Sequence, residues 1–314
     1  MKISVVIPVY QGGRSVGRLV DELVRNLHGK DGLEIVLVND GSTDNSHEEC
    51  LAAFRKHMSI VKYTKLAKNF GEHNAVLAGL NEASGDYAVI IDDDFQNPPE
   101  EIRKMVDKAV EGGYDVVYSY YDRKRHSLLR NLGSSFNDLV ARYLLDKPKD
   151  LYLSSFKCLN RFTVGEIIKY KGPYPYIDGL VLRTTRNIGK VLVKHDKRRE
   201  GRSGYTLRRL IRLWLNMFVN FSVYPLRVST FIGFIFFLIG AVLSLQAVIE
   251  RLVNPSVPMG ITSIFVAILM FSGLQMLMLG VIGEYLGKQF MANNQTPQYV
   301  IRETHAAKKE EGGR

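Results

Sequence analysis

Three consecutive carboxylates follow an apolar run near residue 90. The segment Ile90–Gln96 reads I-I-D-D-D-F-Q, so Asp92, Asp93 and Asp94 come directly after residues typical of a buried strand. Neighbouring carboxylates repel one another and are costly to remove from water, so a cation is expected beside them. In an extended segment residues two apart face the same way, which puts Asp92, Asp94 and Gln96 on one face. Such oxygen ligands suit Mg²⁺ or Mn²⁺ that bridges to substrate phosphates, and a solvated acidic turn is the alternative.

Two further polar segments could bind a nucleotide. The turn Asn39–Asp44 reads N-D-G-S-T-D and could present Asp40 to the imide N–H of a uracil or the N–H groups of a guanine. The same residue types form Asx turns that cap helices, and both roles can hold together. The basic segment His195–Tyr205 contains Arg198 and Arg202, whose guanidinium groups match diphosphate oxygens. Attraction to anionic lipid headgroups is the alternative role for this segment.

Alternating strand and helix patterns must position these residues. Apolar runs predict strands over Ile3–Val9, Glu34–Val38, Ile60–Leu66, Tyr87–Ile91 and Asp115–Ser119. Helical patterns fill the gaps over Ser15–Leu27, Ser46–His57, Glu72–Ala83 and Pro98–Glu111. This alternation is typical of an α/β fold whose parallel sheet is covered on both faces and binds ligands beyond the carboxyl ends of its strands. Neither a Walker loop nor a G-x-G-x-x-G loop follows the first run, so a metal ion is expected to carry the phosphate charge.

The last third of the chain is apolar. Residues 228–249 and 261–282 carry no charged side chain, and each run forms a helix of about 33 Å, enough to cross a bilayer core. They predict a two-helix transmembrane hairpin, with a pair of buried core helices as the alternative. Basic residues flank the hairpin on both outer sides, whereas the connecting loop contains only Arg251. Both termini and the catalytic domain are therefore expected on the cytoplasmic side of the inner membrane.

Two segments before the hairpin have the pattern of helices that lie in a membrane interface. Residues 206–225 place Arg208 and Arg209 beside many apolar side chains. Residues 126–145 are similar and follow the basic run Arg123–Arg125, although a solvated charged face explains this second segment equally well. The predicted organisation is a catalytic domain over residues 1–205, a juxtamembrane helix over 206–225, the hairpin over 226–284 and a cytoplasmic tail over 285–314.

The composition limits the class of protein. The 314 residues are 46% hydrophobic and 24% charged, with a net charge of +10. These values exclude a disordered chain, a collagen-like chain and a small disulfide scaffold. Two cysteines, Cys50 and Cys158, favour reduced thiols in a cytosolic environment. The positive residues gather beside the apolar runs, which a membrane explains better than nucleic acid, so no nucleic-acid partner is expected.

Together these motifs resemble the family 2 glycosyltransferases with a GT-A fold. The nearest branch is that of the polyprenyl-phosphate glycosyltransferases, which includes dolichyl-phosphate mannose synthases and the bacterial GtrB and ArnC type enzymes. The resemblance covers nearly the whole chain. The matching segments are V-V-I-P-V-Y at Val5–Tyr10, the turn Asn39–Asp44, K-N-F-G at Lys68–Gly71, I-D-D-D-F-Q-N-P-P-E at Ile91–Glu100, R-x-x-G-x-S-x-Y at Arg198–Tyr205, and G-E-Y-L-G at Gly283–Gly287.

The resemblance implies a role for each matching residue. It implies a Mg²⁺ or Mn²⁺ ion at Asp92, Asp94 and Gln96, with Asp92, Asp94 and Ser155 as the catalytic positions. Donor contacts are implied for Pro8, Tyr10, Asp40, Lys68, Asn69, Asp92, Asp93, Arg198, Arg202, Ser203 and Tyr205. Contacts to the acceptor phosphate or the membrane are expected for Arg123, Arg125, Arg130, Arg208 and Arg209.

The implied reaction moves a sugar from a nucleotide diphosphate, with UDP favoured over GDP or dTDP, to a polyprenyl phosphate with inversion at the anomeric carbon. The partners are then a nucleotide sugar, an undecaprenyl-type phosphate lipid, the bilayer and further copies of the chain, as a tetramer in the family. The sequence identifies neither the sugar nor the pathway.

The sequence departs from the family pattern at several positions. Gln11 and two glycines replace an acidic pair, Lys68 replaces an arginine, and Gly204 replaces a lysine. Ser155 replaces an aspartate proposed as a general base, and a serine is a poor base unless it is activated. A phosphate acceptor is already ionised near neutral pH, so it needs no base and the serine mildly supports such an acceptor.

Two other functions fit parts of this sequence. A processive polysaccharide synthase of the same superfamily carries a Q-x-x-R-W segment, which is missing around Trp214. A non-catalytic membrane scaffold that keeps the nucleotide-binding fold would explain a serine in place of the proposed base, at Ser155. It would not explain the intact motif from Asp92 to Gln96.

Overall fold

The chain forms two compact units. The computed structural model describes residues 1–27, 29, 32–121, 147–148, 150–194, 224–253 and 260–307. One unit comprises Met1–Thr206 together with Thr296–Arg314, and the other comprises Leu207–Gln295. The end of the chain thus belongs to the same unit as its beginning.

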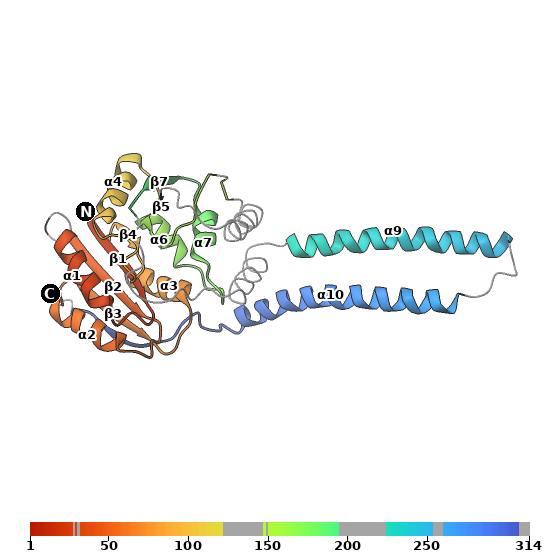
Figure 1. Ribbon diagram of the computed structural model, residues 1–314, viewed down its shortest axis with the longest axis horizontal. Helices are drawn as coiled ribbons and strands as arrows, with labels where there is room; N and C mark the ends of the chain where they lie inside the picture. Colours follow the sequence, from red (N-terminus) through yellow and green to blue (C-terminus); the bar gives the residue numbers. More distant parts are fainter. Residues whose placement is uncertain are drawn as a thin grey trace, which may run out of the picture. The chain divides into compact units, whose positions relative to one another are not determined.

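A mixed sheet forms the centre of the first unit (Figure 1). Over the described residues it has eight strands in the spatial order β7-β5-β6-β4-β1-β2-β3-β8. The strands are β1 (Lys2–Val9), β2 (Gly32–Asn39), β3 (Val61–Leu66), β4 (Tyr87–Ile90), β5 (Val116–Tyr120), β6 (Lys157–Asn160), β7 (Ile188–Leu192) and β8 (Ile301–His305). Strand β6 runs antiparallel to β4 and β5, and β8 runs antiparallel to β3, whereas the remaining pairs are parallel. The predicted α/β class with a mixed, mainly parallel sheet is confirmed.

Helices cover both faces of this sheet because its strands are apolar on both sides. The helices are α1 (Val16–Leu27), α2 (Ser46–Lys56), α3 (Glu72–Glu82), α4 (Glu101–Gly112), α6 (Arg161–Ile167) and α7 (Ile177–Thr184). Buried side chains of α1, α2 and α4 share one hydrophobic core with Val5, Ile7, Ile35 and Leu37. On the opposite face α3 lies so close that a Cβ at Gly79 would meet the side chain of Val6 at 2.4 Å. Both cysteines are buried and unpaired, as expected for reduced thiols.

The second unit consists of α9 (Tyr224–Val253) and α10 (Ile261–Asn293), which run side by side (Figure 1). Gly233 of α9 faces Met278 of α10, and Gly240 faces Phe271, which is an antiparallel register. Small residues let two helices approach closely at these positions. Across the residues described here, none of the helices reaches the combination of length and apolar character that a bilayer crossing requires.

Candidate active site

The polar segments singled out in the sequence meet at one edge of the sheet. Strands β1, β2, β3 and β4 are mutually parallel neighbours, so their carboxyl ends lie at the same edge. Strand β6 is antiparallel to β4, so β6 begins at that edge and the residues just before it lie there too. The topology therefore brings Tyr10, Asp40, Lys68, Asp92 and Ser155 to one region.

The segment after β4 bends instead of continuing as an extended strand. Asp93 and Asp94 form a turn, and Phe95 has a left-handed backbone with φ of 59°. The Asp94 Oδ1 atom accepts a hydrogen bond from the Gln96 backbone N–H at 3.1 Å. The alternation of an extended strand ends with β4, so it does not decide how Asp92, Asp94 and Gln96 are placed relative to one another. Phe95 is buried beneath the guanidinium group of Arg18, 5.7 Å from its ring centre, and a non-glycine residue with this backbone is a frequent sign of a functional loop.

Asp92 and Ser155 are joined directly. The Ser155 hydroxyl donates a hydrogen bond to Asp92 Oδ2 at 2.7 Å across 63 positions of sequence. Burial raises the pKa of Asp92 well above its ordinary value, and the negative charges of Glu72 and Asp94 add to this shift. The hydrogen bond from Ser155 acts in the opposite direction. A cation beside this crowded group of carboxylates would therefore stabilise it.

The oxygen atoms of this loop fit the chemistry of a hard divalent cation. Asp92, Asp94 and Gln96 are half-buried and offer two carboxylates and one amide oxygen. In the part of the chain that is described, no cluster of three or more His, Cys, Asp and Glu side chains is arranged to hold a metal ion. A divalent ion here would take its remaining ligands from substrate phosphates and water, which is the usual way Mg²⁺ is bound.

Asp40 is engaged with the loop that follows β3. Its two carboxylate oxygens accept hydrogen bonds from the backbone N–H groups of Phe70 at 2.7 Å and Gly71 at 2.8 Å. Burial raises the pKa of Asp40, and these two hydrogen bonds oppose the rise. The neighbouring Gly41 has φ of 63°, and a Cβ there would lie 2.4 Å from the Lys68 carbonyl carbon. Asp40 thus fastens the turn after β2 to the Lys68–Gly71 loop.

The loops after β1 and β2 are also fastened together. The Gln11 backbone N–H donates to Ser42 Oγ at 3.1 Å, and the Gln11 side chain donates to Thr43. The Gly12 N–H donates to Ser46 Oγ at 2.9 Å, and the Gly13 N–H donates to Asp44 at 3.1 Å. A Cβ at Gly12 would lie 1.8 Å from Asp93 Oδ2, so a larger residue here would displace the Asp93 carboxylate. The two glycines that depart from the family pattern therefore have a packing role that sequence reasoning missed.

A buried ion pair involves the lysine two residues after Ser155, and it was not predicted from the sequence either. Lys157, the first residue of β6, pairs with Asp178 near the start of α7, and both side chains are almost fully buried. The Tyr118 hydroxyl donates to the same Asp178 oxygen at 2.8 Å, and Lys157 lies over the Tyr118 ring at 5.2 Å. A lysine in the segment S-S-F-K carries no sequence sign of burial, because its partner comes 21 residues later.

The other predicted residues divide into two groups. Tyr10, Lys68 and Asn69 are exposed at the same edge, and Pro8 is half-buried within β1. The remaining predictions lie outside the described residues, namely Arg123, Arg125, Arg130, Arg198, Arg202, Ser203, Tyr205, Arg208, Arg209, the interfacial segment 126–145 and most of the juxtamembrane segment 206–225.

Comparison with known proteins decides the family. The family model described as glycosyl transferase family 2 matches residues 4–165. Undecaprenyl-phosphate 4-deoxy-4-formamido-L-arabinose transferases from Yersinia pestis and Yersinia enterocolitica are 32% identical over 313 residues, which is 99% of this chain and 95% of theirs. The chain belongs to glycosyl transferase family 2. This family 2 enzyme is therefore a glycosyltransferase.

Solved structures give the fold of this glycosyltransferase. Glucosyl-3-phosphoglycerate synthase of Mycobacterium tuberculosis aligns with a TM-score of 0.52 at 18% identity, over 69% of this chain and 78% of that one. A second structure of the same protein, with Mn²⁺ and UDP-glucose bound, also aligns with a TM-score of 0.52 at 18% identity, over 69% of this chain and 77% of that one. The likeness confirms the GT-A fold.

Proposed function

We propose that this glycosyltransferase moves a sugar from a nucleotide diphosphate sugar, with UDP as the favoured nucleotide, to an undecaprenyl-type polyprenyl phosphate. The observation that carries the proposal is the extent of the match to transferases named for that acceptor. It covers 99% of the chain, so it includes α9 and α10 as well as the GT-A unit. A likeness limited to the catalytic unit would support only a common fold.

The acidic loop is the proposed metal site. Asp92, Asp94 and Gln96 would hold Mg²⁺ or Mn²⁺, and the bound ion would neutralise charge on the donor diphosphate. The crowded carboxylates described above support this assignment, and so does the chemistry of their oxygen atoms.

The side chains and loops of the protein provide binding and orientation. The turn around Asp40, held by the Phe70 and Gly71 amides, would contact the base. The nucleoside and diphosphate would be contacted by Tyr10, Lys68, Asn69, Arg198, Arg202, Ser203 and Tyr205. Arginines at 123, 125, 130, 208 and 209 would hold the acceptor phosphate near the membrane. These cationic groups match phosphate oxygens in geometry and charge.

The proposed transfer is a single displacement with inversion. An ionised oxygen of the acceptor phosphate forms a bond to the anomeric carbon as the bond from that carbon to the donor β-phosphate oxygen breaks. The nucleoside diphosphate leaves with the electron pair, and no proton has to be removed from the nucleophile. The step therefore needs no general base at position 155, where this chain has a serine that donates a hydrogen bond to Asp92.

We also place the enzyme at the inner membrane, with the hairpin inserted, the catalytic unit on the cytoplasmic side and several copies associated as in the family. The support lies in the two uncharged runs of the sequence and in large apolar side chains that α9 and α10 expose. Phe231, Val242 and Leu245 of α9 and Met276 and Phe290 of α10 each expose more than 60% of their surface. A hydrocarbon environment would cover such side chains.

A donor screen tests the proposal. Purified full-length protein is incubated with Mn²⁺ or Mg²⁺, undecaprenyl phosphate and a panel of UDP, GDP and dTDP sugars that includes UDP-4-deoxy-4-formamido-L-arabinose. Mass spectrometry then reads the lipid product. We expect one polyprenyl-phosphate monosaccharide from one nucleotide class. A polymer would favour the polysaccharide synthase, and no turnover with any donor would refute the proposed reaction.

A further inference from the structure

We infer that the last strand of the sheet positions the turn that binds the donor base, through Tyr63 and His305. This inference rests on the proposed function, because it takes the Asn39–Ser42 turn as the base site. Strand β8 lies beyond helices α9 and α10 in the sequence, yet it pairs with β3 in the catalytic unit. Donor affinity would therefore depend on the end of the chain.

The first link is the packing of β8 on β3. Tyr63 and His305 are directly opposite each other in the antiparallel register. Their rings are stacked with centroids 5.7 Å apart and planes 9° apart, and Phe54 of α2 contacts the other side of this cluster, 5.6 Å from His305. Tyr63 is completely buried, so the position of its ring is fixed by its neighbours and not by solvent.

The second link runs from Tyr63 to the turn. The Asn39 side-chain NH₂ donates to the Tyr63 hydroxyl at 3.3 Å, and the Asn39 Oδ1 atom accepts from the Ser42 backbone N–H at 2.9 Å. Asn39 is fully buried, so both ends of its amide need these partners. The Ser42 N–H requires the amide oxygen on its side, the tyrosine hydroxyl anchors the NH₂ end, and the amide in turn holds the turn that contains Asp40. Burial raises the pKa of Tyr63, so the hydroxyl stays protonated.

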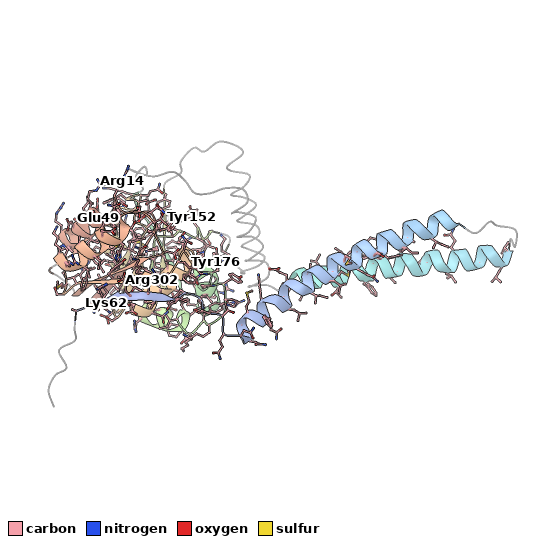
Figure 2. The ribbon with its side chains drawn as sticks, turned by 90° about the horizontal axis from the view of Figure 1, so that it is seen from below. Arg14, Glu49, Lys62, Tyr152, Tyr176 and Arg302 are labelled. Atoms are coloured by element: carbon pink, nitrogen blue, oxygen red, sulfur yellow. The ribbon has the colours of Figure 1, made fainter. Side chains whose placement is uncertain are left out.

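Side-chain contacts of Glu303 hold β8 in this register. Glu303 lies 3.5 Å from His47 Nδ1 and 3.6 Å from Lys65 Nζ, and His47 Nδ1 lies 2.8 Å from the Tyr63 hydroxyl. Glu303 therefore contacts Tyr63 indirectly, through His47, and His305 contacts it directly, through the stacked rings. Arg302, on the same strand, is exposed and provides a matched control (Figure 2).

Four single variants of the full-length protein test the inference, namely Tyr63→Phe, His305→Ala, His305→Phe and Arg302→Ala. Tyr63→Phe keeps the ring stack but removes the hydroxyl, and His305→Phe keeps an aromatic ring on the stack. Isothermal titration with UDP, GDP and dTDP in the presence of Mg²⁺ gives the dissociation constants, and steady-state assays give kcat and KM for the donor.

We expect Tyr63→Phe to raise the dissociation constant of the bound nucleotide about fivefold, the effect of one lost hydrogen bond, with kcat within twofold of wild type. His305→Ala removes the ring that packs on Tyr63 and should raise the dissociation constant to a similar extent. In His305→Phe and Arg302→Ala, the dissociation constant and kcat should both stay within twofold of the wild-type values. Wild-type affinity in Tyr63→Phe would overturn the inference, and so would a loss shared equally by Arg302→Ala. Should His305→Ala fail to fold, Tyr63→Phe and His305→Phe decide the question.

A second measurement separates this inference from the proposed function. If the wild type binds none of the three nucleotides, the proposed donor class fails, and amide hydrogen exchange in the free protein tests the positioning role alone. Faster exchange at Ser42 and its neighbours in Tyr63→Phe than in Arg302→Ala would support the role. Equal exchange in the two variants would refute it.

Discussion

The hydroxyl of Ser155 donates a hydrogen bond to the Asp92 carboxylate at 2.7 Å, which joins the segment before β6 to the acidic loop after β4. Because an ionised phosphate acceptor needs no general base, we expect Ser155→Ala to lower turnover by less than about fivefold, the effect of one lost hydrogen bond. Steady-state assays with a polyprenyl phosphate acceptor measure it. A fall of more than about 100-fold would show that the serine takes part directly in the reaction.

Removal of the Asp94 carboxylate tests the proposed metal site. Asp94→Ala should reduce turnover by about 100-fold or more at every Mn²⁺ concentration, because the diphosphate charge is no longer neutralised. Asp107→Ala provides the control, since Asp107 forms an exposed pair with Arg103 on α4. Comparable rates in Asp94→Ala and Asp107→Ala would refute the assignment, and circular dichroism should show both variants folded.

Gly41 is expected to tolerate no side chain. Its backbone has φ of 63°, and an added Cβ would meet backbone atoms of Lys68 and Asn69 that no rotamer change can move. We expect Gly41→Ala to lower the free energy of unfolding by about 2–4 kcal/mol and to weaken nucleotide binding. Gly113 has a similar φ of 59° but open space around it, so Gly113→Ala should cost only about 1 kcal/mol. Equal losses in urea denaturation would show that the loop contact is unimportant.

Glu34 should make stability depend on pH in acid. Burial alone would raise its pKa, but hydrogen bonds from Ser4 and Ser84 and the ammonium group of Lys62 outweigh it and hold the pKa at about 2, below the ordinary 4.5. A carboxyl whose pKa is lowered in the folded state stabilises the protein above pH 4.5, and this stability is lost as the pH falls towards 2. The full effect is about 3 kcal/mol. Urea denaturation at pH 5 and pH 3 should show a smaller change in Glu34→Gln than in wild type.

The buried pair of Lys157 and Asp178 should be sensitive to loss of either partner. Lys157→Met leaves a buried carboxylate without its cation, which should cost about 3–5 kcal/mol of unfolding free energy. The double variant Lys157→Met with Asp178→Leu removes both charges and should recover most of that loss. Thermal unfolding of wild type, the two single variants and the double variant measures the coupling, and a double variant no more stable than Lys157→Met would contradict it.

Much of the fold could be predicted from local patterns, but part of the sheet could not. The runs predicted at Ile3–Val9, Glu34–Val38 and Tyr87–Ile91 form β1, β2 and β4 with ends that differ by at most two residues. Strands β6 and β8 read K-C-L-N and I-R-E-T-H, and neither has the apolar run on which strand prediction depends. Tertiary pairing with β4 and β3 makes them strands.

In the candidate site too, local patterns predict some features, and tertiary contacts decide the others. The positions of Asp40 and Asp92 at strand ends follow from the alternation of strands and helices. Their partners, the Phe70 and Gly71 amides and the Ser155 hydroxyl, do not, because they depend on how separate loops meet. For the same reason, the bend at Asp93 and Asp94 could not be predicted from the period of an isolated strand.

The late position of β8 in the sequence has a consequence for biogenesis. While the chain is still on the ribosome, β3 has an open edge, and it keeps that edge until both long helices have been synthesised and residues 301–305 emerge. An unpaired edge can capture a strand from another molecule. Nascent chains that stall within α9 or α10 are therefore expected to associate through the open edge of β3.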